Sequence, residues 1–174
     1  MRSLAELFVS SQDFLEMGGD VLLVILATTF VMWALIIERY WYFRQAAPET
    51  VAEVTERWRR RRERTSWHAH QIRRATVSRL SIEMHHSIPF IKTLVAVCPM
   101  LGLLGTVTGM VEVFDVMAFS GSGNPRAMAG GVSRATIPTM AGMVAAISGF
   151  LFSVALERRA RQATQRIADE LAPE

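Results

Sequence analysis

The chain has 174 residues, of which 51% are hydrophobic, and a formal net charge of +3. Its length would allow one small water-soluble helical bundle, but the apolar residues gather in three uncharged runs, 21–37, 93–111 and 135–156. At a rise of about 1.5 Å per residue, roughly 17 to 25 apolar residues cross a hydrocarbon core of about 30 Å. The composition therefore excludes a soluble bundle and predicts an all-α polytopic membrane protein with three transmembrane helices.

The segment before the first run does not have the features of a cleaved signal peptide. It contains Glu6, Asp13 and Glu16, and the run is followed by the charged and aromatic stretch "ERYWYFR" instead of a small-residue cleavage site. We expect the first span to be retained. Apolar residues at roughly helical spacing in 3–16 predict a short amphipathic helix on the outer face of the membrane. The alternative is an extension of the first span, broken at Gly18-Gly19.

Basic residues are distributed asymmetrically about the spans. Residues 40–92 hold eleven Arg or Lys, whereas Arg2 is the only one before the first span and Arg126 the only one in the predicted loop 119–127 between the second and third. Because basic residues near span ends stay cytoplasmic, the 40–92 segment and the C-terminus are predicted inside and the N-terminus outside. Pro48 and the acids that follow it predict a helix start, and nothing breaks a helix from there to His86. One or two long cytoplasmic helices are expected.

The cytoplasmic segment contains the arginine-rich run "RWRRRRER". In a membrane protein such a run favours an anchor for anionic lipid headgroups over a nucleic-acid site. Its arginines are Arg57, Arg59, Arg60, Arg61, Arg62 and Arg64. The histidines of "HAH" and "HH" lack metal-site spacing, and the single cysteine, Cys98, cannot form an intramolecular disulfide. We expect no metal, no cofactor and no bound nucleic acid.

Small residues recur at helical spacing in the second and third spans. Such residues share one helix face and let helix backbones approach closely in lipid. Two prolines, Pro99 and Pro138, are expected to bend these spans and free backbone carbonyls. The predicted packing glycines are Gly102, Gly105, Gly109, Gly142 and Gly149.

Thr106 and Thr139 lie within the small-residue faces. Threonines in spans commonly bond back to their own helix carbonyls, but on these faces their hydroxyls would point toward neighbouring helices or a cavity. Proton relays in membranes use Asp, Glu or His, and none lies deep in any span. If protons cross here, a second protein must supply the carboxylate. No nucleophile, base and orienting group occur together, so an enzyme is not expected.

The stretches "CPMLGLLGTVTGMVEVF" and "GGVSRATIPTMAGMVAAISGFLF" resemble the ExbB/TolQ/MotA family of proton-driven motor subunits, and most of all its ExbB branch. The resemblance covers about residues 90 to 160 and the order of the spans. It implies a bacterial inner-membrane protein that forms a homopentameric ring around single-span ExbD helices, whose aspartate carries protons. It also implies coupling to TonB and outer-membrane uptake of siderophores and similar cargo. Thr106 and Thr139 match the family's pore threonines, and Pro99 matches its proline.

One position departs from the family pattern. Arg134 stands where familiar ExbB members have a glutamate at the outer end of the third span. A cation cannot carry a proton there, but it could contact a partner carboxylate. A TolQ-like role in outer-membrane integrity and a non-conducting membrane scaffold remain alternatives, while a MotA-like role would need a larger, four-span architecture.

The expected organisation follows these boundaries. It comprises an outer-face amphipathic segment (1–19), transmembrane helix 1 (20–39), a basic cytoplasmic helical segment (40–92), transmembrane helix 2 (93–118), a short periplasmic loop (119–127), transmembrane helix 3 (128–157) and a cytoplasmic tail (158–174).

Overall fold

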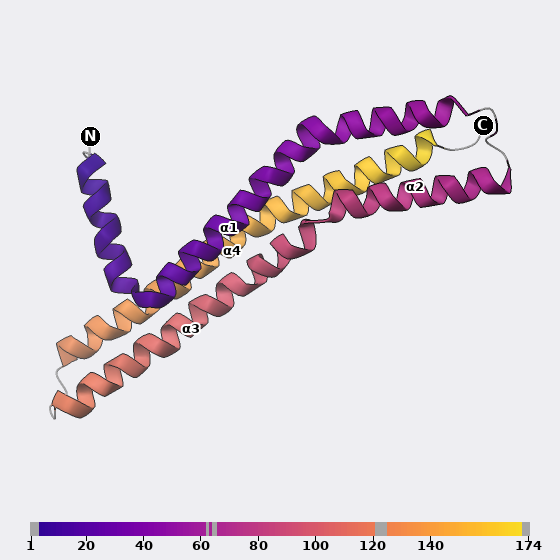
Figure 1. The fold of residues 1–174 in the computed structure, drawn as a ribbon. Helices are drawn as coiled ribbons and strands as arrows, with labels where there is room; N and C mark the ends of the chain where they lie inside the picture. Colours follow the sequence, from indigo (N-terminus) through magenta and orange to yellow (C-terminus); the bar gives the residue numbers. More distant parts are fainter. Residues whose placement is uncertain (1–3, 62, 64–65, 121–124, 172–174) are drawn as a thin grey trace. The chain divides into compact units, whose positions relative to one another are not determined.

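The protein consists of long helices joined by short connections (Figure 1). The computed structural model describes residues 4–61, 63, 66–120 and 125–171, with side chains from residue 19 onward and outside 120–128. The four helices are α1 (Leu4–Arg59), α2 (Trp67–His85), α3 (Ile88–Ser120) and α4 (Pro125–Glu170). Three helical stretches, within α1, from α2 into α3 and within α4, are long and apolar enough to cross a membrane. The predicted all-α protein with three membrane-spanning helices is confirmed.

The helices form two compact units. The first, here called the apolar unit, comprises Met1–Met32 and Thr93–Gly149. The second, the charged unit, comprises Trp33–Lys92 and Phe150–Glu174. Helices α1 and α4 each have a long segment in both units, and α3 begins in the charged unit and continues in the apolar unit. Helices α1 and α4 are therefore packed in two different ways along their length.

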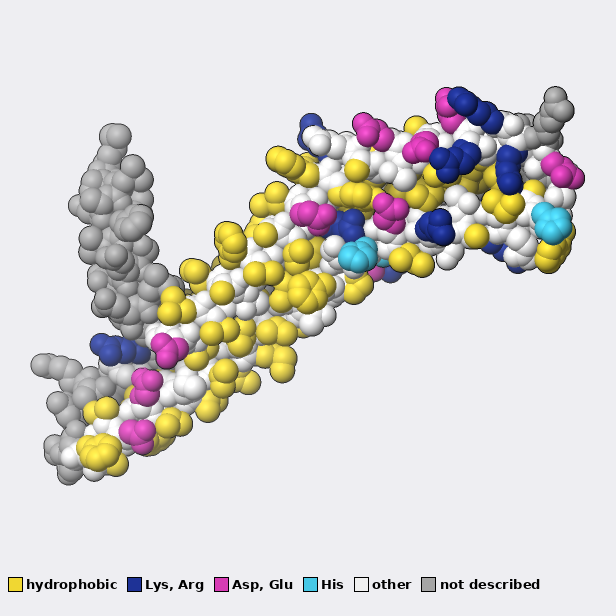
Figure 2. Space-filling view, viewed as in Figure 1, with side chains coloured by type: hydrophobic (Ala, Val, Ile, Leu, Met, Phe, Trp, Pro, Cys, Tyr) yellow, Lys and Arg dark blue, Asp and Glu magenta, His cyan; other side chains and the backbone are white. Residues whose placement is uncertain are grey.

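The apolar unit packs segments of α1, α3 and α4 with few large buried side chains. Its buried residues include Leu22, Ile25 and Met32 of α1 and Cys98 of α3. Large apolar side chains point outward instead, among them Phe30 at 74% exposure. Figure 2 shows such side chains gathered on the surface of these segments. Outward apolar side chains around a thin core are what a helix bundle in hydrocarbon requires, because lipid is as apolar as leucine.

The charged unit packs segments of α1, α2 and α4 and the first residues of α3 around conventional buried apolar residues. Met84, Ile91, Ile167 and Leu171 are almost fully buried. Acidic and basic side chains gather on its surface (Figure 2). This unit therefore has the polar exterior and apolar interior of a bundle in water.

Local sequence signals explain where the helices begin and bend. Ser66 caps α2, since its hydroxyl accepts a hydrogen bond from the Ala69 N–H at 3.3 Å. Within α1, Gly19 interrupts the helical backbone with φ 62° and ψ −168°. Glycine adopts a positive φ at little cost. The alternative to a separate amphipathic helix placed a break at Gly18-Gly19, and the structure has an interruption at Gly19.

The predicted helix start at Pro48 is wrong, because Pro48 lies inside α1. Proline lacks the N–H that would bond the carbonyl of Arg44, four residues earlier, and normally disfavours a helix interior. Beyond the proline, Thr55 and Trp58 are buried in the charged unit. Packing of this face sustains the helix that local sequence disfavours.

Candidate functional site between α3 and α4

Glycines of α3 and α4 bring the backbones of these two helices close together in the apolar unit. A Cβ atom built on Gly102 would lie 2.9 Å from the Thr139 Cα and 3.1 Å from the Pro138 carbonyl oxygen. One built on Gly142 would lie 2.5 Å from the Cys98 carbonyl oxygen. No side chain fits at either position without displacing backbone, so these glycines set the distance between the two helices.

The same contact continues along both helices. A Cβ on Gly105 would overlap the ring of Pro138, and a Cβ on Gly109 would lie 2.9 Å from the Ala135 Cα. We call this contact the α3–α4 seam. It is formed by Gly102, Gly105 and Gly109 of α3 with Ala135, Pro138, Thr139 and Gly142 of α4 and the Cys98 carbonyl.

Thr139 forms a hydrogen bond across the seam. Its hydroxyl donates to the Gly102 carbonyl oxygen at 2.9 Å. A carbonyl oxygen has two lone pairs, so it can accept this bond in addition to its helical one. The absence of a side chain on Gly102 brings that carbonyl within reach. Thr139 therefore links α4 to α3 instead of bonding back to its own helix.

Thr106 behaves differently. Its hydroxyl donates to the Leu103 carbonyl of its own helix at 2.7 Å, and the side chain is half-buried. Thr108 does the same with the Leu104 and Gly105 carbonyls, at 3.1 Å each. The structure thus separates the two predicted pore threonines: one hydroxyl bridges two helices and the other is satisfied locally.

The remaining predicted packing residues lie apart from the seam. A Cβ on Gly149 would overlap the Met32 sulfur of α1, so this glycine accommodates a third helix. Pro99 lies inside α3 with its side chain exposed, whereas Pro138 is buried against Gly105. The two prolines therefore have different surroundings, and only Pro138 contributes its ring to the seam.

Arg134 lies beside a hollow of about 360 Å³ beyond the glycine-rich part of the seam. Glu112, Val113 and Gly131 also line this hollow. Both Arg134 and Glu112 are exposed, and no ion pair joins them in the part of the chain that the structure describes. The Arg134 guanidinium is therefore accessible to a carboxylate from outside this chain.

Carboxylates are scarce in the apolar unit. Those among its described side chains are Asp20, Glu112 and Asp115, and all three are exposed. Within the described residues, no group of three or more His, Cys, Asp or Glu is placed to hold a metal ion. A buried carboxylate is thus absent from the described interior of this unit.

Arg39 of the charged unit is a buried cation that sequence reasoning missed. It is only 5% exposed, its guanidinium donates to the Glu83 carbonyl at 3.2 Å, and it lies 4.9 Å from the Tyr42 ring centroid. Position 39 follows Met32 and Ile36 at i+7 and i+3 on one helix face. This position on an apolar helix face is the feature of the sequence that could have predicted the burial of Arg39.

Tyr42 completes this cluster. Its hydroxyl donates to the Glu83 carboxylate at 2.9 Å. Burial raises the pKa of Tyr42 above its usual range, and the hydrogen bond to Glu83 raises it further. The hydrogen bond from Tyr42 to Glu83 joins α1 to α2.

The predicted lipid-anchoring arginines are exposed where the structure describes them. Arg57 pairs with Glu53 at 2.7 Å and Arg60 with Glu56 at 3.1 Å, each four residues apart on α1. Arg59 and Arg61 are exposed as well, and Arg62 and Arg64 lie outside the described residues. Exposed pairs of this kind are weak and can exchange partners.

Comparison with known proteins places this arrangement in a family. The MotA/TolQ/ExbB proton channel family matches residues 44–169, well over half of the chain. The chain belongs to this family. Its matched region includes α2, α3, nearly all of α4 and the whole α3–α4 seam. The resemblance inferred from the sequence is confirmed at the level of the family.

Two relatives from Synechocystis sp. carry ExbB-like names. The chain is 35% identical to biopolymer transport protein ExbB-like 1 over 92 residues, or 51% of this chain and 36% of that protein. It is 38% identical to biopolymer transport protein ExbB-like 3 over 64 residues, or 36% of this chain and 30% of that protein. The chain therefore matches about a third of the length of each relative.

Proposed function

We propose that this chain is the ring-forming subunit of a proton-driven motor of the ExbB type in the bacterial inner membrane. The observation that carries the proposal is the α3–α4 seam, a close helix pair with Thr139 at its centre in a proton channel family member. The ring would be a homopentamer around ExbD-like helices, coupled through a TonB-like protein to uptake of siderophores and similar cargo. The basic segment supports a cytoplasmic C-terminus and a periplasmic N-terminus.

In this proposal the seam supplies the polar surface and the partner supplies the proton carrier. The described interior of the apolar unit holds no carboxylate, so an ExbD-like aspartate would take up and release the proton beside Thr106 and Thr139. Arg134 would contact that carboxylate from the end of the third span. Each proton falling through about 100 mV yields roughly 2.3 kcal/mol, which can bias a displacement or rotation between two arrangements.

A non-conducting scaffold is the second candidate. One observation favours it: the hydroxyls of Thr106 and Thr139 already donate hydrogen bonds within this chain. On that account both residues serve packing only, and proton-coupled work does not depend on them. A TolQ-like subunit for outer-membrane integrity would use the same ring and differ in the partner that it drives.

Threonine variants separate the motor from the scaffold. In the native host, Thr106→Val and Thr139→Val should leave the assembled complex at its normal level and reduce siderophore-dependent growth. Thr108→Val is the matched control and should grow normally. Thr108 lies on α3, as Thr106 does, and its hydroxyl donates to carbonyls of its own helix. Normal growth of both test variants would support the scaffold. Normal growth with defective outer-membrane integrity would support the TolQ-like role.

A further inference from the structure

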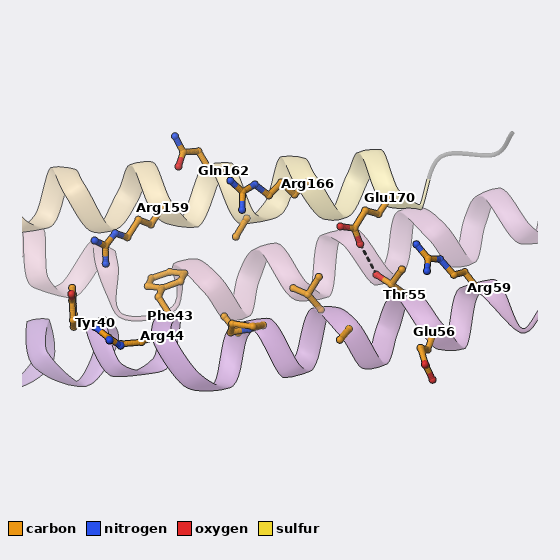
Figure 3. A pocket seen from close by; sticks show the side chains of 15 residues that line it. Tyr40, Phe43, Arg44, Thr55, Glu56, Arg59, Arg159, Gln162, Arg166 and Glu170 are labelled. Carbon is orange, nitrogen blue, oxygen red and sulfur yellow. Dashed lines mark hydrogen bonds between the residues drawn. The ribbon is translucent and has the colours of Figure 1, made fainter.

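A groove in the charged unit has properties that the proposed motor function does not use. It occupies about 790 Å³ between α1 and α4. The α1 side runs from Tyr40 to Arg59, and the α4 side from Arg159 to Glu170 (Figure 3). Phe43, Val51 and small residues form an apolar floor between these polar rims. The groove is therefore amphipathic, with charge at its edges and apolar surface at its base.

Charge is unevenly distributed along the groove. Arg44 and Arg159 lie together at the Tyr40 end, and Arg166 follows toward the middle (Figure 3). Among the ion pairs of the described residues, none involves these three arginines. The acids of the groove, Glu56 and Glu170, lie at the opposite end, and each interacts with another side chain.

Each acid of the groove has its own partner. Glu56 pairs with Arg60 at 3.1 Å, and Glu170 accepts a hydrogen bond from the Thr55 hydroxyl at 2.9 Å. Neither neutralises the arginines at the Tyr40 end. That end carries an uncompensated positive charge that an anion would complete.

Tyr40 positions one of these arginines. The Arg159 guanidinium lies 4.9 Å from the centroid of the Tyr40 ring, within cation–π range. Tyr40 and Arg44 are four residues apart and share a face of α1. Guanidinium groups from two helices therefore face one end of the groove, which suits bidentate recognition of a phosphate.

The same helix faces become apolar one or two turns away, toward the membrane-spanning runs. Ile37, seven residues before Arg44, is 52% exposed, and Phe152, seven residues before Arg159, is 45% exposed. Residues seven apart share a helix face. An anion held by the arginines would thus have exposed apolar surface beside it on both helices.

We propose that the Tyr40 end of the groove is a binding site for an anionic phospholipid. Arg44 and Arg159 bind the headgroup phosphate, Arg166 adds positive charge, and the acyl chains lie along Ile37 and Phe152. The apolar floor and flanks favour a lipid over free phosphate, which would gain nothing from them. Basic pockets beside spanning helices bind such headgroups. The site is separate from the "RWRRRRER" run and does not depend on the proposed motor function.

Lipid retention tests this site in the full-length protein. Protein purified in mild detergent is exposed to equal amounts of phosphatidylglycerol and phosphatidylcholine, and bound lipid is measured by native mass spectrometry. Wild type should retain phosphatidylglycerol selectively. R44Q/R159Q should lose about tenfold in phosphatidylglycerol affinity, the scale of lost charge-assisted hydrogen bonds. R158Q/R161Q removes the same charge from α4 residues outside the groove and should bind as wild type.

Several results would overturn the proposal. Equal binding of both lipids by wild type, equal loss in the two double variants, or no loss in R44Q/R159Q would each do so. Displacement of the lipid by inorganic phosphate at matched concentration would identify a free-anion site instead. If R44Q/R159Q does not fold, R44Q alone takes its place, because Arg44 is exposed. It should lose affinity in the same direction by a smaller factor.

Discussion

The two units of this protein hold the same two helices, α1 and α4, by different means. In the apolar unit, glycines bring backbones together, and the Thr139 hydroxyl of α4 donates a hydrogen bond to the Gly102 carbonyl of α3. In the charged unit, side chains reach across between helices. The bridging contacts there include Arg39 to the Glu83 carbonyl, Tyr42 to Glu83, Thr55 to Glu170, Arg73 to the Ala168 carbonyl and Lys92 to Glu157.

The solvent explains this difference. Lipid offers no hydrophobic preference for helix over acyl chain, so association there depends on close backbone packing. Water drives burial of apolar residues directly and tolerates charged side chains at the edges. A substitution that adds volume should therefore damage the apolar unit most, and one that removes a polar bridge should damage the charged unit most.

The largest expected effect comes from adding a side chain to the seam. Gly142→Leu would drive a side chain into the Cys98 carbonyl. We expect the free energy of unfolding to fall by about 3 kcal/mol, the upper end of the usual range for overpacking. Thermal unfolding of the detergent-solubilised protein measures it. Gly130→Leu is the control, since a Cβ there meets nothing within 4 Å. Similar losses in both variants would mean that the seam does not set the packing.

A smaller effect is expected from removing the buried cation of the charged unit. Arg39→Met keeps apolar volume but loses the bond to the Glu83 carbonyl. Because the variant no longer has to bury a charged group, part of that loss is offset. We therefore expect the free energy of unfolding to fall by about 1 to 2 kcal/mol. The same unfolding assay applies, with the exposed Arg158→Met as control. A gain in stability would mean that burying the guanidinium costs more than its contacts return.

The smallest effect is expected from the single polar bridge of the seam. Thr139→Val keeps the shape and removes the donor to Gly102, and hydrogen bonds between membrane helices average about 0.6 kcal/mol. Unfolding of Thr139→Val beside Thr136→Val, whose hydroxyl donates to its own helix at Ser133, isolates the bridge. A loss as large as that of Gly142→Leu would contradict the view that glycine packing dominates.

The sequence predicts the spans well because hydrophobicity and the absence of charge are local properties. It fails at Pro48, where packing of Thr55 and Trp58 overrides the local preference of proline. It also could not assign the Thr139 hydroxyl to the Gly102 carbonyl, because these residues are 37 positions apart and their pairing depends on how α3 and α4 are aligned. Arg39 lies on an apolar helix face, but its charge indicated the end of a span, so its burial was not predicted.

The functional residues divide in the same way. The glycine spacing indicated which faces of α3 and α4 could approach closely, whereas the different hydrogen bonds of Thr106 and Thr139 required the three-dimensional structure. The amphipathic groove beside Tyr40 combines residues from α1 and α4 that lie more than a hundred positions apart in the chain. No local pattern predicts such a pairing.

The central claim is that the carboxylate that carries the proton comes from another chain. Native mass spectrometry of the gently extracted complex, expressed with its genomic neighbour, tests this most directly. The account predicts a ring of five copies that retains a small single-span protein with an aspartate in its span. A ring or a single chain that never captures such a partner would contradict it, because the described interior of the apolar unit holds no carboxylate of its own.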